Sequence, residues 1–185
     1  VKQLDGMPLA IELAAARMAM LSPAQLVQRL PRRFDLLSGA RADVNARQAT
    51  LRGAIDWSWE LLQGHEQLAL AQLAVFRGGF TIEAAEAVVS LAAFPSAPWA
   101  LDVVQALRDK SLVRTWEAAG FPGEMRFGFF ESIREYALEK LKTLGPTAES
   151  EARARHAAWY LESAKGWLSK LETREATSVL DRLQV

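Results

Sequence analysis

The most constraining feature of this sequence is a change of hydrophobic period between residues 125 and 144. Apolar residues first alternate with polar or small ones, at Met125, Phe127 and Phe129, as they do in a half-buried strand. They then recur about every 3.6 residues from Ile133 and Tyr136 onward, as they do along one face of a helix. The pattern predicts a strand that runs directly into a helix, and a junction of this kind can join two bodies.

Residues 1–63 are predicted to form a helical domain. Turn chemistry and a proline at residues 5–8 precede an alanine-rich stretch from Leu9 to Met20. Ser22-Pro23-Ala24-Gln25 has the form of a capping box for a second, short helix. A further helix is expected from Gln48 to Leu62. Its two tryptophans, Trp57 and Trp59, are expected in the core or at a domain interface, ahead of any ligand-stacking role.

Residues 64–145 have the pattern of a winged helix, which is three helices followed by a β-hairpin. The predicted elements are helices over Glu66–Phe76, Ile82–Val89 (with Thr81 as N-cap) and around Ala100–Leu107, and strands over Leu112–Trp116 and Met125–Phe129. We expect Phe127 and Phe129 on the buried face of the hairpin. Ile133 and Tyr136 are expected to hold the next helix against the winged helix.

Residues 146–185 are predicted to start a helical-repeat arm. Gly145-Pro146 breaks the preceding helix, and Thr147 is expected to cap a long one. One broad face of that helix carries Ala152, His156, Trp159, Tyr160, Ser163, Trp167 and Leu171, a stripe more typical of core or helix-partner surface than of a cofactor site. Thr173 to Val185 is predicted to begin a further helix. The fold class is therefore mainly α: a helical domain, a winged helix with a small β-hairpin, and the start of a helical arm.

Composition excludes several kinds of site. The 22 Lys and Arg residues balance the 22 Asp and Glu residues, so no global field draws the chain to nucleic acid or to an anionic membrane. Cysteine is absent and there are two histidines, which argues against disulfides and against zinc. No apolar run is long enough to span a bilayer, and no secretion signal opens the chain. We expect a cytoplasmic location, and the start at Val1 suggests a piece of a longer protein.

Catalytic motifs are also missing. The sequence contains no P-loop, no nucleophile elbow and no metal-spaced histidine pair, so we expect no enzyme activity from this fragment. A winged helix often binds DNA through its third helix. That helix carries Asp102, Arg108, Asp109 and Lys110, whose charges nearly cancel. Because basic residues dominate DNA affinity, the pattern argues against direct DNA binding.

Four short motifs occur in an order that resembles a known family. They are Gly6-Met7-Pro8-Leu9-Ala10, Ala54-Ile55-Asp56-Trp57-Ser58-Trp59-Glu60-Leu61-Leu62, Asp109-Lys110-Ser111-Leu112-Val113 and Ile133-Arg134-Glu135-Tyr136-Ala137. From about Leu4 to about Leu171 the chain resembles the part that follows the ATPase core in NB-ARC, or STAND, signal-transduction NTPases. The similarity is greatest to large bacterial regulators of the AfsR and LuxR-associated type.

The resemblance implies roles for two pairs of residues. Gly6 and Pro8 would lie on the adenine side of a bound nucleotide in the full-length parent, although Pro8 could equally do no more than start a helix. The family's Met-His-Asp motif aligns with Phe129, Phe130 and Glu131. A phenylalanine cannot donate a hydrogen bond to phosphate, so the resemblance does not extend to phosphate sensing by Phe130. Phe130 and Glu131 are instead assigned to a hinge.

The function implied by the resemblance is that of a regulatory fragment in an ATP-dependent switch, and the switch would control transcription. The parent would bind ATP or ADP with magnesium and act as an ATPase, whereas this fragment is expected to bind no cofactor. The implied partners are an upstream P-loop domain, downstream TPR-like repeats and other copies on activation, with no membrane. The alternative is a free-standing winged-helix DNA-binding transcription factor, and a plain helical-repeat scaffold is a third reading.

Overall fold

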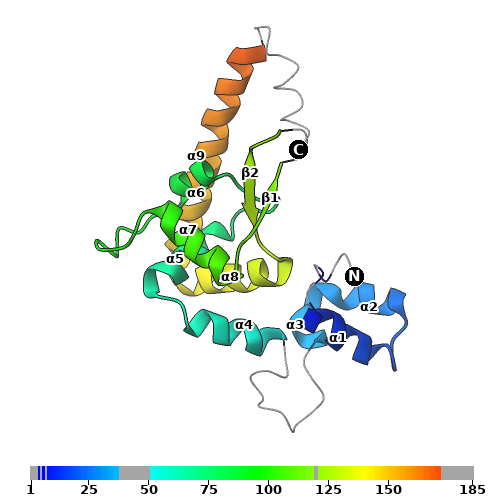
Figure 1. Cartoon of the computed structure of the whole chain (residues 1–185). Helices are drawn as coiled ribbons and strands as arrows, with labels where there is room; N and C mark the ends of the chain where they lie inside the picture. The colour runs from blue at the N-terminus through cyan, green and yellow to red at the C-terminus, as the bar shows by residue number, and fades with distance from the viewer. Residues whose placement is uncertain (1–3, 5, 7, 38–50, 119–120, 172–185) are drawn as a thin grey trace. The chain divides into compact units, whose positions relative to one another are not determined.

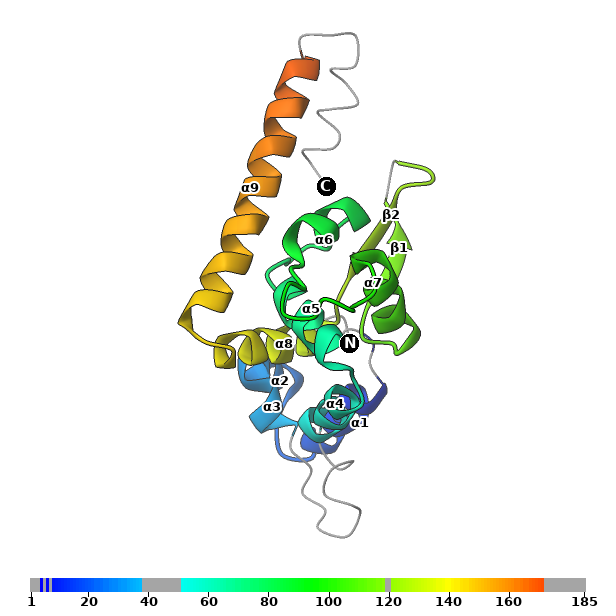
Figure 2. The same ribbon diagram turned by 90° about the vertical axis from the view of Figure 1, so that its left-hand side faces the viewer.

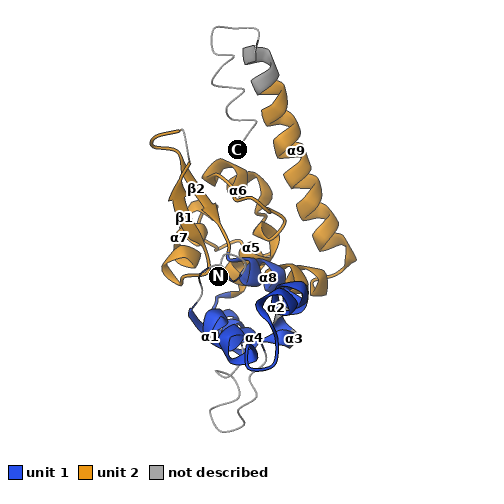
Figure 3. Cartoon of the chain, turned by 90° about the vertical axis from the view of Figure 1, so that its right-hand side faces the viewer, with its two compact units in different colours: residues 1–63, 130–136 blue, residues 64–129, 137–185 orange. Residues whose placement is uncertain are grey.

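The computed structural model describes residues 4, 6, 8–37, 51–118 and 121–171. These residues are mainly helical and include one two-stranded antiparallel sheet, which confirms the predicted fold class (Figures 1 and 2). The chain separates into two compact units (Figure 3). Unit 1 comprises residues 1–63 and 130–136, and unit 2 comprises residues 64–129 and 137–185. The division into domains at residues 63 and 145 stays a prediction.

Unit 1 is built from short helices. Its elements are α1 (Pro8–Arg17), α2 (Pro23–Arg29), the 3-10 helix η2 (Leu30–Arg32), α3 (Arg33–Leu36), α4 (Leu51–Glu60) and the start of α8 (Glu131–Thr143). The capping box at α2 is confirmed, because the Ser22 side chain accepts from the Gln25 N–H and the Gln25 side chain accepts from the Ser22 N–H. Arg17 joins α1 to α3 by donating from Nε to the Leu36 carbonyl at 2.9 Å.

Unit 2 has the element order of a winged helix. Its elements are α5 (Gly64–Leu73), α6 (Ile82–Val88), α7 (Ala100–Asp109), β1 (Arg114–Glu117), β2 (Met125–Gly128), the rest of α8, and α9 (Pro146–Leu171). Strands β1 and β2 pair antiparallel, with Thr115 opposite Phe127. The predicted cap is confirmed, since Thr81 Oγ1 accepts from the Ala84 N–H at 3.3 Å.

An aromatic cluster around Phe80 connects the hairpin to the helices of unit 2. The backbones of Phe80 and Phe127 exchange two N–H···O hydrogen bonds, both 2.8 Å long. The Phe80 side chain is fully buried, and its ring lies 4.9 Å from that of Phe76, 6.0 Å from that of Phe127 and 5.7 Å from that of Phe129. Phe129 is buried, as expected, whereas Phe127 is half-buried. Chain segments before and after the hairpin strands therefore share one aromatic core.

Trp116 explains why a glycine precedes Phe80. Gly79 has a φ of 101°, and a side chain there would come within 2.7 Å of the Trp116 ring. A Cβ added at Gly128 would meet the same ring at 2.8 Å. Glycine is required at 79 both for its left-handed backbone and for the close approach of the tryptophan.

Helix α9 is held against α5 and α6 by polar contacts. Arg155 Nε donates to the Val88 carbonyl at the end of α6 (2.7 Å), and its Nη2 donates to the Gln72 side chain of α5 (3.2 Å). Gln72 also exchanges hydrogen bonds with the Ser90 backbone. The prediction that Thr147 caps this helix is wrong, because α9 begins at Pro146 and Thr147 lies inside its first turn. Proline suits the first position because it lacks the N–H that a first-turn residue leaves unpaired.

The aromatic stripe of α9 is partly confirmed. His156 and Tyr160 are half-buried, and their rings lie 4.7 Å and 6.4 Å from that of Phe76. The side chains of Trp167 and Leu171, and the predicted helix from Thr173, lie outside the described residues. Within the described part of the chain, no helix is both long enough and apolar enough to cross a membrane.

The burial of His156 predicts a pH-dependent stability. Burial lowers the pKa of His156 below its usual 6.5, and the charge of Arg153 lowers it further. Below pH 6.5 the unfolded chain therefore binds more protons at this position than the folded chain, so stability falls as the pH falls. We expect melting between about pH 8 and about pH 5.5 to show a larger loss of Tm for the wild type than for His156→Gln. Equal losses in the two proteins would contradict this origin.

Candidate functional site at the start of helix α8

The chain passes directly from strand to helix at the predicted junction. Strand β2 ends at Gly128 and α8 begins at Glu131. Phe129 is buried and belongs to unit 2, whereas Phe130 is half-buried and is the residue at which the chain enters unit 1. The boundary between the two units therefore falls between Phe129 and Phe130. Helix α8 then contributes residues 131–136 to unit 1 and its remaining residues to unit 2.

Glu131 forms an ion pair in the first turn of α8. Arg134 Nε donates to Glu131 Oε2 at 3.1 Å, and its Nη2 donates to Oε1 at 2.5 Å. This two-point geometry is the strongest form of an arginine–carboxylate pair. The hydrogen bond from Arg134 to Glu131 raises the pKa of Arg134, against the opposing effect of burial. A carboxylate at this place also interacts favourably with the amino end of the helix dipole.

Tyr136 joins α8 to α4, a contact that the sequence did not predict. Its hydroxyl donates to Asp56 Oδ1 of α4 at 2.5 Å, and only 1% of the residue is exposed. Its ring meets that of Trp59 edge-on at 5.8 Å. A buried tyrosine hydroxyl needs a hydrogen-bond partner, and α4 supplies a carboxylate; the expected contact of Tyr136 with the winged helix stays a prediction. Ile133, on the same helix, is buried as expected.

Arg52 adds a cation beside the tyrosine. Its guanidinium carbon lies 5.7 Å from the centre of the Tyr136 ring and 5.2 Å from that of Phe34. Both distances are within the range of a cation–π attraction. We call Arg52, Asp56, Trp59, Glu131, Arg134 and Tyr136 the junction cluster, and all of its members belong to unit 1.

Sequence reasoning named Glu131 but missed the bond between Asp56 and Tyr136. The sequence held one hint of this bond: Asp56 lies in the motif of residues 54–62, and Tyr136 lies in the motif of residues 133–137. Trp57 and Trp59 were expected in the core or at a domain interface. Trp57 is 52% exposed, which excludes the core for that residue, whereas Trp59 is half-buried; the interface stays a prediction. Residues two apart on a helix point in different directions, so one helix face cannot bury both tryptophans.

Gly6 and Pro8 lie at the start of α1. Gly6 has a φ of 69°, a left-handed conformation in which a side chain would be strained. Pro8 is the first residue of α1 and is exposed. The exposed ring is compatible with the predicted packing against adenine, and equally with a proline that only starts a helix. The predicted site residues therefore lie as two pairs, Gly6 with Pro8 and Phe130 with Glu131, and their functional assignments stay predictions.

The side chains of Phe129 and Phe130 offer a phosphate no hydrogen-bond donor. Phe129 is buried, Phe130 has no side-chain donor, and Glu131 is an anion already paired with Arg134. Among the residues that the structure describes, no cluster of three or more His, Asp or Glu side chains could hold a metal ion.

Comparisons with known proteins find relatives in mycobacteria. A Mycobacterium tuberculosis H37Rv protein named "Putative HTH-type transcriptional regulator" is 42% identical over 160 residues, which cover 86% of this chain and 17% of that protein. A second H37Rv protein, named as uncharacterized, is 39% identical over 154 residues, covering 83% of this chain and 38% of its own length. A Mycobacterium bovis protein matches as the first does.

The coverage limits what these names say about the chain. The chain spans about a sixth of the first relative, so a helix-turn-helix in that protein need not lie in the aligned part. No protein-family model matches the sequence. No solved structure matches it either.

The bond between Tyr136 and Asp56 should be measurable as a coupling energy. In a double-mutant cycle of Tyr136→Phe and Asp56→Ala we expect a coupling of about 1.5–3 kcal/mol, the range for hydrogen bonds to charged groups. The control is the exposed pair Arg153 and Glu149 on α9, at 2.7 Å, for which we expect about 0.3–0.5 kcal/mol. Urea unfolding gives both values, and equal couplings would rule out a special role for the Tyr136 bond.

Proposed function

We propose that this chain is the relay portion of a transcriptional regulator of the NB-ARC, or STAND, type. Its helical unit and winged helix would pass on the state of a nucleotide-binding core that lies elsewhere in the protein. Two findings support the regulator class: the four family-like motifs, and the name of the relatives that are 42% identical. The greater length of those relatives leaves room for a core and an output domain.

The observation that carries this proposal is the sharing of α8. Its first residues are bonded to α4 inside unit 1, while the same helix continues into unit 2. Because an α-helix is stiff over its length, a rotation of its first turn is carried along the helix. The Tyr136–Asp56 bond and the Glu131–Arg134 pair are contacts that can form in one state and break in another. Such a two-state contact is what a switch requires.

The nucleotide itself would be held mainly outside this chain. We propose that the parent binds ATP or ADP with magnesium, and that Pro8 contributes an apolar contact to the adenine. The chain would have no ATPase activity of its own, since Pro8 alone leaves the phosphates unrecognised. The role of the junction cluster is to hold one arrangement of α8 against α4 until the core changes state.

Glu131→Ala in the full-length parent tests the relay. The substitution removes the partner of Arg134 but no part of the hydrophobic core, so we expect a change of at least about threefold in reporter output, with only a small change in Tm. Glu139→Ala, an exposed carboxylate on the same helix, is the control. Unchanged output with normal melting would leave the junction with a purely structural role.

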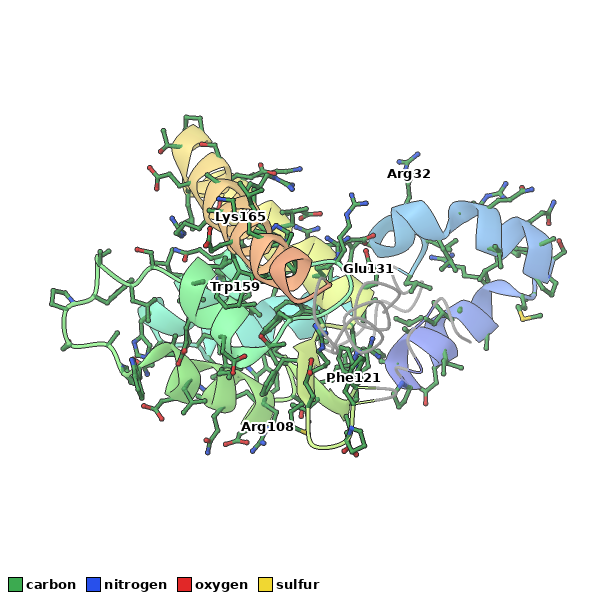
Figure 4. All side chains as sticks on the ribbon, turned by 90° about the horizontal axis from the view of Figure 1, so that it is seen from above. Arg32, Arg108, Phe121, Glu131, Trp159 and Lys165 are labelled. Atoms are coloured by element: carbon green, nitrogen blue, oxygen red, sulfur yellow. The ribbon has the colours of Figure 1, made fainter. Side chains whose placement is uncertain are left out.

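The name of the relatives favours a second candidate, a winged-helix protein that binds DNA directly. The cations that such a protein would use are engaged in unit 2. Arg108 projects from α7 and pairs with Asp109 at 2.9 Å (Figure 4). Lys110 pairs with the buried Glu66 at 2.6 Å. On the wing, Arg126 pairs with Glu124 at 3.3 Å and Arg114 lies over Trp116 at 5.2 Å.

Mobility shifts at increasing salt distinguish the two candidates. Because these cations already have partners, we expect only weak binding that is indifferent to sequence and is lost by about 150 mM salt. Arg108→Ala should then change little. A band that survives this salt and competitor DNA, and that Arg108→Ala abolishes, would establish the DNA-binding function instead.

A further inference from the structure

Helix α9 has one exposed face, and the residues on it repeat with heptad spacing. The opposite side of the helix is fixed to unit 2, since Arg155 bonds to α5 and α6 and Ala152 is fully buried. Figure 4 shows Lys165 on the side of α9 that faces away from the other helices of unit 2. The exposed residues follow one another at intervals of four and three positions: Thr147, Glu151, Ala154, Ala158, Leu161 and Lys165. Residues at this spacing form one stripe along a helix.

The middle of this stripe is apolar and its ends are charged. Leu161 is 61% exposed, and Ala154 and Ala158 are exposed beside it. Apolar residues at heptad spacing are the pattern by which two helices pack side by side. Because alanine side chains are short, two such helices can approach to about 8 Å between their axes. At about 1.5 Å per residue, the stripe from residue 147 to residue 165 is about 27 Å long.

The charges make the stripe complementary to a second copy of itself. Glu151 and Lys165 each lie seven residues from Ala158, on opposite sides of it. If two copies run antiparallel with a two-fold axis near Ala158, Glu151 of each copy lies within about one helical turn of Lys165 of the other. A parallel pair would instead place like charges together. Lys165 also contacts Glu162 of its own helix at 3.3 Å, but both side chains are exposed, so this contact competes only weakly.

We propose that two copies of this chain associate through the exposed face of α9, antiparallel and with the two-fold axis near Ala158. Four or five turns of helix with small side chains make an interface at the low end of the range for specific complexes. We therefore expect a reversible dimer with a dissociation constant of roughly tens of micromolar. The proposal does not rest on the function proposed above, because the same face is present whether the chain relays a nucleotide state or binds DNA.

Single cysteines test the direction of the pairing, because the chain has no cysteine of its own. Ala158→Cys and Thr147→Cys both place a thiol at an exposed position of the stripe. In the antiparallel dimer the two copies of residue 158 are neighbours, whereas the two copies of residue 147 are more than about 25 Å apart. With the 185-residue chain at about 200 µM, a short bis-maleimide should link Ala158→Cys into covalent dimers at least about tenfold faster than Thr147→Cys. Equal rates, or no covalent dimer of Ala158→Cys, would overturn the proposal.

Charge reversal tests the ion pairs. Analytical ultracentrifugation from about 5 to about 500 µM measures the dissociation constant of each variant. Lys165→Glu should raise it about tenfold, because two attractions become two repulsions, and Glu151→Lys combined with Lys165→Glu should restore it to within about threefold of the wild type. Lys142→Glu, at an exposed position of α8, makes the same change of net charge and should leave it unaltered. A monomeric wild type over the whole range, or a double variant no tighter than Lys165→Glu alone, would refute the antiparallel dimer.

Discussion

The pairing of Phe80 with Phe127 is the contact on which unit 2 depends. It combines two backbone hydrogen bonds with a fully buried ring, so it joins the connection between α5 and α6 directly to the wing. Trp116 can cover this pairing only because Gly79 and Gly128 leave room for its ring. Glycine and aromatic residues therefore act together: the absence of a Cβ at two positions permits the burial of a large side chain at a third.

Polar side-chain contacts also join the helices of unit 2 to one another. The side chain of Gln72 bonds the Ser90 backbone and accepts from Arg155, which fixes α5, α9 and the end of α6 to one another. The pair formed by Lys110 and the buried Glu66 fixes the end of α7 to the start of α5. Ser111, just beyond, has a φ of 61°, which starts β1 in a direction that a regular helix end would not give. These charges hold the elements of unit 2 to one another.

In unit 1 the central interaction of the junction cluster is the hydrogen bond from Tyr136 to Asp56. A phenylalanine at 136 would fill the same volume, but it could not bond the Asp56 carboxylate. A buried bond to a charged acceptor is strong when formed and costly to leave unmade, so it favours one arrangement of two helices over intermediate ones. This property, together with the pair of Glu131 and Arg134, is the physical basis of the relay that we propose for the junction cluster.

The sequence by itself determined the local elements: the change of period at the junction, the capping box at Ser22, the cap at Thr81, and the order of three helices and a hairpin. These follow from backbone preferences and hydrophobic spacing, which act over a few residues. Only the tertiary structure decided which side chains meet. Local spacing does not predict that Trp59 is half-buried while Trp57 is exposed. Nor does it predict the hydrogen bond from Tyr136 to Asp56. Such pairings depend on residues far apart in the chain, and the energy of each is set by what surrounds it after folding.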